Sequence, residues 1–238
     1  MNFKFLPNLI TLFNLFIGCI VTLLLIENNL EVKNIFIITL ACLILDYLDG
    51  YLARKLNVKS DLGIQLDSLA DMVSFGLVPG ILLYNMFNSA SSTSVGSISS
   101  SFIPLMGFVI TLSSAYRLAR FNTRKSTSNF FKGLPTPANT VLIYSFAIIS
   151  AEENSYSNII LNYNFLMLIV IVSSILLVSN IKLLNFKFKS LKFKGNRSRF
   201  FIMFISIPTL IIFGIYSIPL LLSVYILTSI FSFYKLKN

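Results

Sequence analysis

Four aspartates are the residues of this chain best suited to chemistry. Asp46 and Asp49 are three residues apart, and Asp67 and Asp71 are four apart, so on two helices each pair shares one face. The connection between the two helices is short, which favours antiparallel neighbours that bring both pairs to a similar depth. Four carboxylates in one small pocket repel one another unless cations neutralise them. Hard oxygen ligands favour Mg²⁺, Mn²⁺ or Ca²⁺, so we predict a site for one or two divalent cations.

Small residues and one arginine surround these carboxylates. Gly50, Ala53 and Gly63 leave room for a nucleotide or a pyrophosphate to approach the backbone closely. Arg54 offers a planar guanidinium to a phosphate group. A glycine alone would more often indicate helix packing, so the functional interpretation depends on the whole pattern.

The helices that position these residues have the composition of a membrane protein. The chain of 238 residues is 55% hydrophobic, 12% charged and has a mean hydropathy of +0.81. Its apolar runs are each about long enough to cross a hydrocarbon core of about 30 Å as a helix. We predict an all-α, polytopic transmembrane bundle of about eight spans, with the fifth and the last two short. The runs are 6–26, 34–54, 63–85, 102–122, 136–151, 163–181, 200–214 and 217–234.

The net charge of +10 indicates topology rather than nucleic acid binding. With the N-terminus in the cytoplasm, 18 of the 19 Lys and Arg residues fall on the cytoplasmic side and only Lys33 lies outside. No soluble domain remains to bind nucleic acid. The aspartates then lie at or near the cytoplasmic ends of the second and third spans, where ionisable groups are costly unless paired, hydrated or bound to a cation.

The chain is expected to divide into a catalytic part and a C-terminal extension. Residues 1–181 form the catalytic membrane domain of six spans, and residues 182–238 form a basic cytoplasmic loop with two additional spans. Within 182–199, Lys alternates with Phe and Leu, which suits a stretch in contact with anionic membrane lipids. A solvated loop that obeys the positive-inside rule explains it equally well.

The aspartates and the small residues among them form one pattern of fixed spacing. It is Asp46-x-x-Asp49-Gly50-x-x-Ala53-Arg54, then after eight residues Gly63-x-x-x-Asp67-x-x-x-Asp71. Every fixed position matches the signature of the CDP-alcohol phosphatidyltransferases, and the chain therefore resembles that family. The resemblance implies an intramembrane site for two metal ions, Mn²⁺ or Mg²⁺, transfer of a phosphatidyl group from a CDP-activated lipid to an alcohol with release of CMP, and a homodimer.

Further stretches resemble one branch of that family, the bacterial and archaeal phosphatidylserine synthases. The matching stretches are Pro7 to Thr11 with Asn14 and Gly18, Gln65 to Ala70, Ser74 to Gly76 with Pro79, Tyr116 to Asn122, and Lys132 to Ala138. They cover about the first 140 residues. The resemblance implies CDP-diacylglycerol and L-serine as substrates, phosphatidylserine as product, and a place in the cytoplasmic membrane among its lipids.

The resemblance also assigns roles to individual residues. Asp46, Asp49, Asp67 and Asp71 are expected to bind the metals, with Asp67 also catalytic and Asp71 the general base for the attacking hydroxyl. Six residues are expected to line the CDP end, namely Asn8, Thr11, Gly50, Ala53, Arg54 and Gly63. For Asn8 and Thr11, capping of the first helix is the alternative.

Four basic residues are candidates for binding the carboxylate of the acceptor. They are Arg117, Arg120, Arg124 and Lys132, at the cytoplasmic end of the fourth span and in the following loop. Each of them is equally well explained by topology alone. A phosphorylated acceptor would also attract several cations, so charge alone does not select serine.

Two other functions compete with this prediction. The first is another enzyme of the same family, with glycerol 3-phosphate or inositol phosphate as the acceptor. The second is a cation transporter, because carboxylates within a membrane also mark ion pathways. A transporter would not need the Gly-Ala-Arg spacing, and its polar residues would be distributed through the bilayer, whereas here they gather at one face.

Overall fold

The computed structural model describes residues 5–58, 60–90, 102–123, 131–152, 155–184 and 197–235, and nearly all of them are helical. The helices and the two short strands follow in this order along the chain: α1 (Leu6–Glu27), α2 (Val32–Lys55), α3 (Asp61–Met72), the π-helical turn η2 (Val73–Leu77), α4 (Val78–Ser89), η3 (Ile103–Gly107), α5 (Phe108–Thr123), β1 (Phe131–Lys132), α6 (Thr136–Ala151), α7 (Ser157–Ile160), α8 (Tyr163–Val178), β2 (Lys182–Leu183), α9 (Arg197–Phe213), η4 (Gly214–Ser217) and α10 (Ile218–Lys235).

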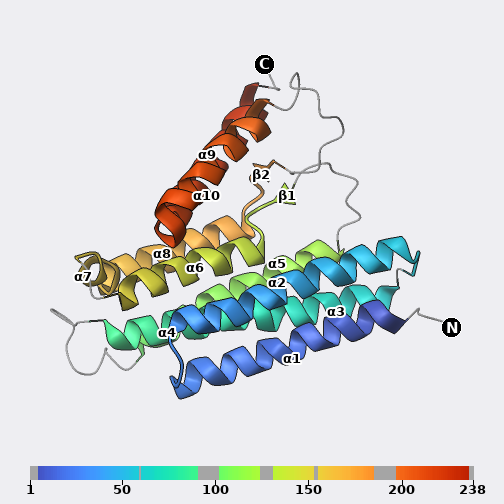
Figure 1. Cartoon of the computed structure of the whole chain (residues 1–238), viewed down its shortest axis with the longest axis horizontal. Coiled ribbons are helices and arrows are strands. Elements are labelled where there is room, and N and C mark those ends of the chain that lie inside the picture. The colour runs from blue at the N-terminus through green and yellow to red at the C-terminus, as the bar shows by residue number, and fades with distance from the viewer. Residues whose placement is uncertain are drawn as a thin grey trace.

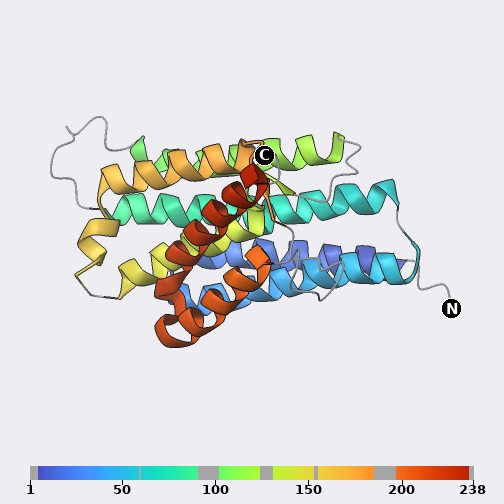
Figure 2. The ribbon, with the colours of Figure 1, turned by 90° about the horizontal axis from the view of Figure 1, so that it is seen from above.

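The long helices form a bundle with a separate C-terminal hairpin. Helices α1 to α6 and α8 run alongside one another, and α9 and α10 rise from the bundle at an oblique angle (Figures 1 and 2). Strands β1 and β2 pair antiparallel over two residues each, and Leu184, which follows β2, bonds to Tyr225 and Ser229 of α10. The predicted all-helical architecture is therefore confirmed, apart from this short pair of strands.

Each of the eight predicted apolar runs is helical, but they differ in length. Within the described residues, four segments are long and apolar enough to cross a membrane, namely Leu6–Glu27, Val32–Lys55, Asp61–Ser89 and Arg199–Ser232. Helices α6 and α8 are apolar but have 16 residues each. The last segment turns back on itself at Gly214, whose φ of 53° is left-handed, and so forms the hairpin of α9 and α10.

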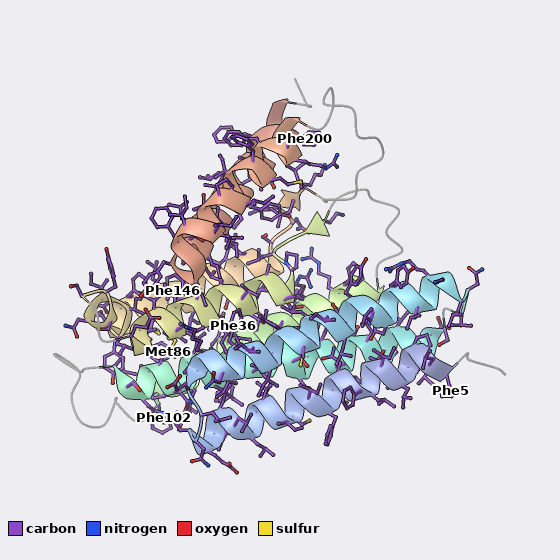
Figure 3. All side chains as sticks on the ribbon, viewed as in Figure 1. Phe5, Phe36, Met86, Phe102, Phe146 and Phe200 are labelled. Carbon is purple, nitrogen blue, oxygen red and sulfur yellow. The ribbon has the colours of Figure 1, made fainter. Side chains whose placement is uncertain are left out.

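Helix α1 has a polar inner face and an apolar outer face. Thr11 and Asn14 are 4% and 1% exposed, whereas Leu9, Phe13 and Phe16 are each more than half exposed. A helix in water would show the reverse arrangement. Exposed aromatic and aliphatic side chains also project from the outside of the bundle and the hairpin (Figure 3). Lipid is therefore the surrounding that this surface requires.

Local sequence signals set the helix ends that frame the polar end of the bundle. The side chain of Ser60 caps α3 by accepting a hydrogen bond from the backbone N–H of Gly63 at 3.0 Å. Pro7 stands in the first turn of α1, where a missing N–H costs nothing. At the opposite end of the bundle, Asn28, with a φ of 53°, ends α1.

The apolar core lies toward the opposite end of the bundle, around α4 and α6. Leu83, Phe87, Ile143 and Tyr144 are completely buried there, and the hydroxyl of Tyr144 lies 2.8 Å from that of Thr39 on α2. This core fixes α2, α4 and α6 relative to one another. The polar end of α2 and α3 is thereby held in a defined position.

The turn before α6 is held against the C-terminal end of α8. The backbone N–H of Leu134 donates to the carbonyl of Leu176 at 2.9 Å, and that of Gly133 donates to the carbonyl of Ile181 at 2.9 Å. Gly133 has a φ of 73°, and a β-carbon at this position would lie 2.8 Å from the carbonyl oxygen of Leu177. A glycine is therefore required where the chain enters α6.

Candidate active site

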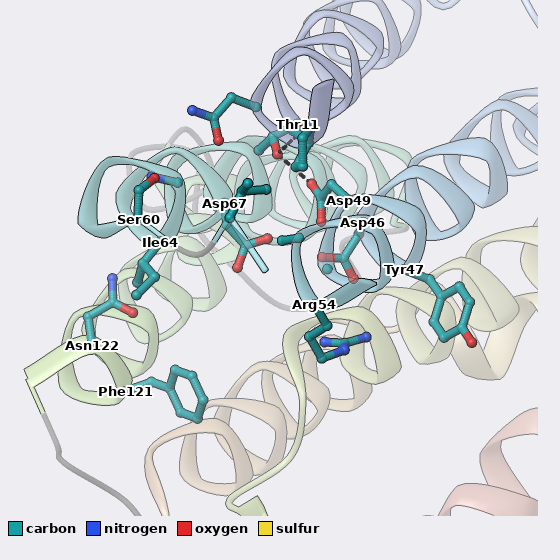
Figure 4. A pocket seen from close by; sticks show the side chains of 16 residues that line it. Thr11, Asp46, Tyr47, Asp49, Arg54, Ser60, Ile64, Asp67, Phe121 and Asn122 are labelled. Atoms are coloured by element: carbon teal, nitrogen blue, oxygen red, sulfur yellow. Dashed lines mark hydrogen bonds between the residues drawn. The ribbon is translucent and has the colours of Figure 1, made fainter. Parts of the chain in front are cut away.

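Three of the four predicted carboxylates meet between α2 and α3. One oxygen from each of Asp46, Asp49 and Asp67 lies within 4.8 Å of the others (Figure 4). Asp49 is 5% exposed, and the other two are partly buried. Oxygen ligands at this separation, partly withdrawn from solvent, fit a hard divalent cation. The prediction that the two aspartate pairs converge is confirmed for these three residues.

A threonine from α1 forms a hydrogen bond with Asp49. The hydroxyl of Thr11 lies 2.6 Å from Oδ2 of Asp49 and 3.0 Å from the carbonyl oxygen of Pro7 (Figure 4). The short distance to a carboxylate is typical of a charge-assisted hydrogen bond. Thr11 therefore orients a candidate metal ligand, in addition to lining the site as predicted from the sequence.

Asp71 lies outside this group of three. It follows Asp67 by one helical turn, and it interacts electrostatically with Asp46, Asp67 and Arg117. Its Oδ1 atom is buried and has no hydrogen-bond partner among the residues that the structure describes. The four carboxylates are thus arranged as a compact group of three with one neighbour, rather than as four equivalent ligands.

A pocket of about 580 Å³ opens beside the three carboxylates. This volume is within the range of small-molecule sites. All six residues that the sequence predicted for the CDP end line it, together with Asp46, Asp49 and Asp67. The remaining lining residues, which the prediction missed, are Pro7, Tyr47, Val58, Ser60, Ile64, Phe121 and Asn122.

The small residues keep this pocket open. A β-carbon at Gly63 would lie 3.1 Å from both Oδ1 of Asn8 and Oγ of Ser60, and one at Gly50 would lie 3.3 Å from Nη1 of Arg54. Either addition would therefore press on a polar side chain that lines the pocket. That these glycines make room for a nucleotide or a pyrophosphate stays a prediction.

The four basic residues predicted for the acceptor separate in the structure. Arg117 on α5 interacts electrostatically with Asp71. Arg120, one turn further, donates to the carbonyl oxygen of Val178 at 2.8 Å and to Oδ1 of Asn180 at 2.6 Å, so it caps the end of α8. Lys132 is exposed on β1, opposite Lys182, and Arg124 lies outside the described residues. Among the described residues of this set, Arg117 is the one that meets an aspartate of the site.

Asn122 is a site residue whose role the sequence did not reveal. Its side-chain nitrogen donates to Oγ of Ser68 at 2.8 Å, which connects α5 to α3 beside the pocket. The aromatic rings of Tyr47 and Phe121 stand at the same pocket, from α2 and α5 (Figure 4). No periodicity marks such residues, because their position depends on how α5 packs against α3.

The fold and the site together are those of a helical protein with four described segments apolar and long enough to cross a membrane, and with an acidic pocket at one end of its bundle. The family model described as CDP-alcohol phosphatidyltransferase matches residues 4–177. This range includes every helix that contributes to the pocket. The chain belongs to the CDP-alcohol phosphatidyltransferase family.

Similar proteins come from bacteria and archaea. A CDP-diacylglycerol–serine O-phosphatidyltransferase of Helicobacter pylori strain J99 is 31% identical over 94% of this chain and 89% of its own length. A protein of the same name from Methanocaldococcus jannaschii is 32% identical over 73% of this chain and 70% of its own. An archaetidylserine synthase from Methanothermobacter thermautotrophicus is 33% identical over 76% of this chain and 70% of its own length.

Proposed function

We propose that this chain transfers the phosphatidyl group of CDP-diacylglycerol to the hydroxyl of L-serine, giving phosphatidylserine and CMP. The observation that carries the proposal is the pocket in which Asp46, Asp49 and Asp67 meet the small and polar residues of α1, α2 and α3. The choice of serine is supported by relatives named for serine transfer that align along most of the chain.

The carboxylates of Asp46, Asp49 and Asp67 are the proposed metal ligands, with Asp71 beside them. Their oxygen donors and their partial burial suit Mn²⁺ or Mg²⁺, and we propose two ions. Bound ions would neutralise the charge of the pyrophosphate and stabilise the leaving CMP. Thr11 holds Asp49 in place for this role through the bond of 2.6 Å.

The CDP end of the lipid is proposed to occupy the pocket of about 580 Å³. Asn8 and Thr11 offer hydrogen bonds, and the guanidinium of Arg54 offers charge to a phosphate. Gly50, Ala53 and Gly63 leave space for close approach of the nucleotide. The lipid chains would extend into the bilayer, alongside the exposed apolar side chains of the bundle.

Asp71 is the proposed general base. It is one turn from Asp67 and outside the compact group of three, so it is the carboxylate with most freedom to accept a proton. The hydroxyl oxygen of serine forms the new bond to phosphorus, the bond from phosphorus to the CMP oxygen breaks, and the serine proton passes to Asp71. Asp67 is proposed to be catalytic as well, because it lies beside Asp46 among the metal ligands.

We propose that the chain spans the cytoplasmic membrane about eight times with its N-terminus inside. Residues 1–181 would form the catalytic membrane domain, and residues 182–238 the basic loop and two further spans. This topology places 18 of the 19 Lys and Arg residues on the cytoplasmic side and opens the site to cytoplasmic serine. A homodimer surrounded by membrane lipids is the proposed assembly.

Product identification with the purified protein tests this function. The enzyme is incubated with Mn²⁺, CDP-diacylglycerol and, separately, L-serine, glycerol 3-phosphate or inositol phosphate, and the lipid product is identified by mass spectrometry. We expect phosphatidylserine. Product formation from glycerol 3-phosphate but not from serine would overturn the acceptor, and release of CMP without any acceptor would overturn the transfer reaction.

A further inference from the structure

A second set of buried polar side chains lies on α5 and α6, the helices that contact the segment from Asp71 to Gly76. Several of their atoms, and one of Asp71, are buried without a hydrogen-bond partner among the described residues: Oδ1 of Asp71, Nε of Arg117, Oγ1 of Thr136 and both amide atoms of Asn139. Thr136 and Asn139 are both 0% exposed. A buried polar atom without a partner costs about 1–3 kcal/mol, so such a concentration points to a bound polar group.

The contacts of α6 place Thr136 level with Asp71. Oγ1 of Thr140 lies 3.1 Å from the carbonyl oxygen of Phe75. Helices α3 and α6 run in the same direction (Figure 1). Asp71 precedes Phe75 by four residues and Thr136 precedes Thr140 by four, so in parallel helices Asp71 and Thr136 lie at a similar level along the bundle. The first turn of α6 therefore faces the region of Asp71.

Helix α5 approaches Asp71 from another side. Arg117 interacts electrostatically with Asp71, and both residues are only partly buried. One turn deeper, the β-carbon of Ser114 lies 3.1 Å from the position that a β-carbon of Gly76 would take. The hydroxyl of Ser114 is also buried without a partner in the described chain. The polar face of α5 and the first turn of α6 thus flank the same segment, from Asp71 to Gly76.

This set is separate from the pocket proposed for CDP. Asp71, Arg117, Thr136 and Asn139 are all absent from the lining of that pocket. Asp71 nevertheless interacts with Asp46 and Asp67, so the two groups of residues adjoin at the carboxylates. A transfer reaction needs two approaches of this kind, one for the donor and one for the acceptor.

The chemistry of the set fits the amino-acid end of the acceptor. A guanidinium, the amide N–H₂ of Asn139 and the positive end of α6, a helix of 16 residues, all favour a carboxylate. The amide oxygen of Asn139 and the hydroxyl of Thr136 can accept hydrogen bonds from an ammonium group. A phosphate monoester would bring about two negative charges beside Asp71, and a zwitterion brings none.

We propose that Thr136 and Asn139, with Arg117, form the subsite that binds the carboxylate and ammonium groups of the acceptor and directs its hydroxyl to Asp71. This inference rests on the proposed function. It assigns acceptor recognition to two uncharged residues that the charge pattern did not indicate, and it leaves Arg120 to hold the end of α8.

Steady-state kinetics of Asn139→Leu and Thr136→Val test the subsite. We expect each substitution to raise the KM for serine about tenfold or more, because a hydrogen bond to a charged group is lost, while the KM for CDP-diacylglycerol stays within about twofold. Thr136→Ser, which keeps the hydroxyl, should restore the wild-type KM for serine. Ser145→Ala is the matched control, because Ser145 is equally buried on α6 but bonds within its own helix, to Leu142.

Two analogues identify the groups that are recognised. Ethanolamine lacks the carboxylate and 3-hydroxypropionate lacks the ammonium group, and we expect both to compete with serine in the wild type more weakly than serine itself binds. The advantage of serine over both should shrink in Asn139→Leu. If the affinity for serine relative to each analogue is the same in Asn139→Leu as in the wild type, the role of Asn139 is overturned.

The remaining outcomes separate this proposal from the proposed function. A wild-type enzyme that does not use serine overturns both. A wild type that uses serine, with variants whose KM for serine is unchanged, overturns the subsite alone. Variants whose two KM values, kcat and thermal midpoint in detergent all change together reveal a structural role, which also overturns it.

Discussion

Replacing Thr11 by Val tests whether α1 holds a metal ligand in place. Valine has nearly the same shape but cannot donate the hydrogen bond of 2.6 Å to Asp49. A hydrogen bond to a charged group contributes about 1.5–3 kcal/mol, which corresponds to about 10- to 150-fold in an equilibrium constant. Loss of a residue that orients a metal ligand typically weakens metal binding about 10- to 100-fold. We therefore expect the half-saturating Mn²⁺ concentration to rise by at least about tenfold.

Two measurements and two controls make this prediction specific. Half-saturation is measured from CMP release, and binding is measured independently from the electron paramagnetic resonance signal of free Mn²⁺. Thr11→Ser should restore both values. Thr22→Val, on the same helix, removes a hydroxyl that donates to the carbonyl of Gly18 within its own helix and should change neither. Unchanged Mn²⁺ binding in Thr11→Val would refute the orienting role.

Three further substitutions probe the base, the CDP pocket and the π turn. Asp71→Asn should reduce kcat about 10²- to 10⁴-fold while Mn²⁺ binding remains. Asp46→Asn should instead weaken Mn²⁺ binding itself. Retained turnover with lost metal binding in the Asp71 variant would contradict the role of Asp71 as base. Gly63→Ala should raise the KM for CDP-diacylglycerol about fivefold, the equivalent of one hydrogen bond of about 1 kcal/mol, because the added carbon displaces Asn8; an unchanged KM contradicts this. Thr140→Val should lower the thermal midpoint in detergent, because it leaves the buried carbonyl of Phe75 in the π turn without this hydrogen bond. Thr140→Ser should not lower it. Equal midpoints for Thr140→Val and the wild type would argue against the bond.

The convergence of the carboxylates was predictable because it depends on local periodicity. Residues three or four apart share a helical face, and a short connection makes the two helices neighbours. These two rules suffice to bring Asp46, Asp49 and Asp67 together. The helices of the apolar runs were predictable for the same reason, since each depends on consecutive residues, whereas four described segments are long and apolar enough to cross a membrane.

Contacts between distant helices were not predictable in this way. The bond between Thr11 and Asp49 joins residues 38 positions apart, and its partner depends on the packing of α1 against α2. Charge likewise did not distinguish Arg117 from Arg120, although one faces Asp71 and the other caps α8. The spacing of Thr11, Asn14 and Gly18 on one face of the first span is the signal that could have revealed a polar inner surface.

The π turn η2 explains how one helix serves both the site and the core. It follows Asp71 directly and contains one residue more than a regular helical turn, which changes the helical phase by about 100°. A π turn leaves backbone carbonyls without their regular partners. Here the hydroxyl of Thr111 donates to the carbonyl oxygen of Gly76 at 2.9 Å, and the hydroxyl of Thr140 donates to the carbonyl oxygen of Phe75.

These bonds come from α5 and α6, the two helices that flank Asp71. The hydroxyl of Ser74 adds a third connection, 3.2 Å from Oδ1 of Asn14 on α1. Before the turn, the phase of α3 directs Asp67 toward α2; after it, the phase of α4 buries Leu83 and Phe87 in the apolar core. The interruption therefore separates the face of this segment that bears the carboxylates from the face that packs in the core, and π turns are frequent at functional sites.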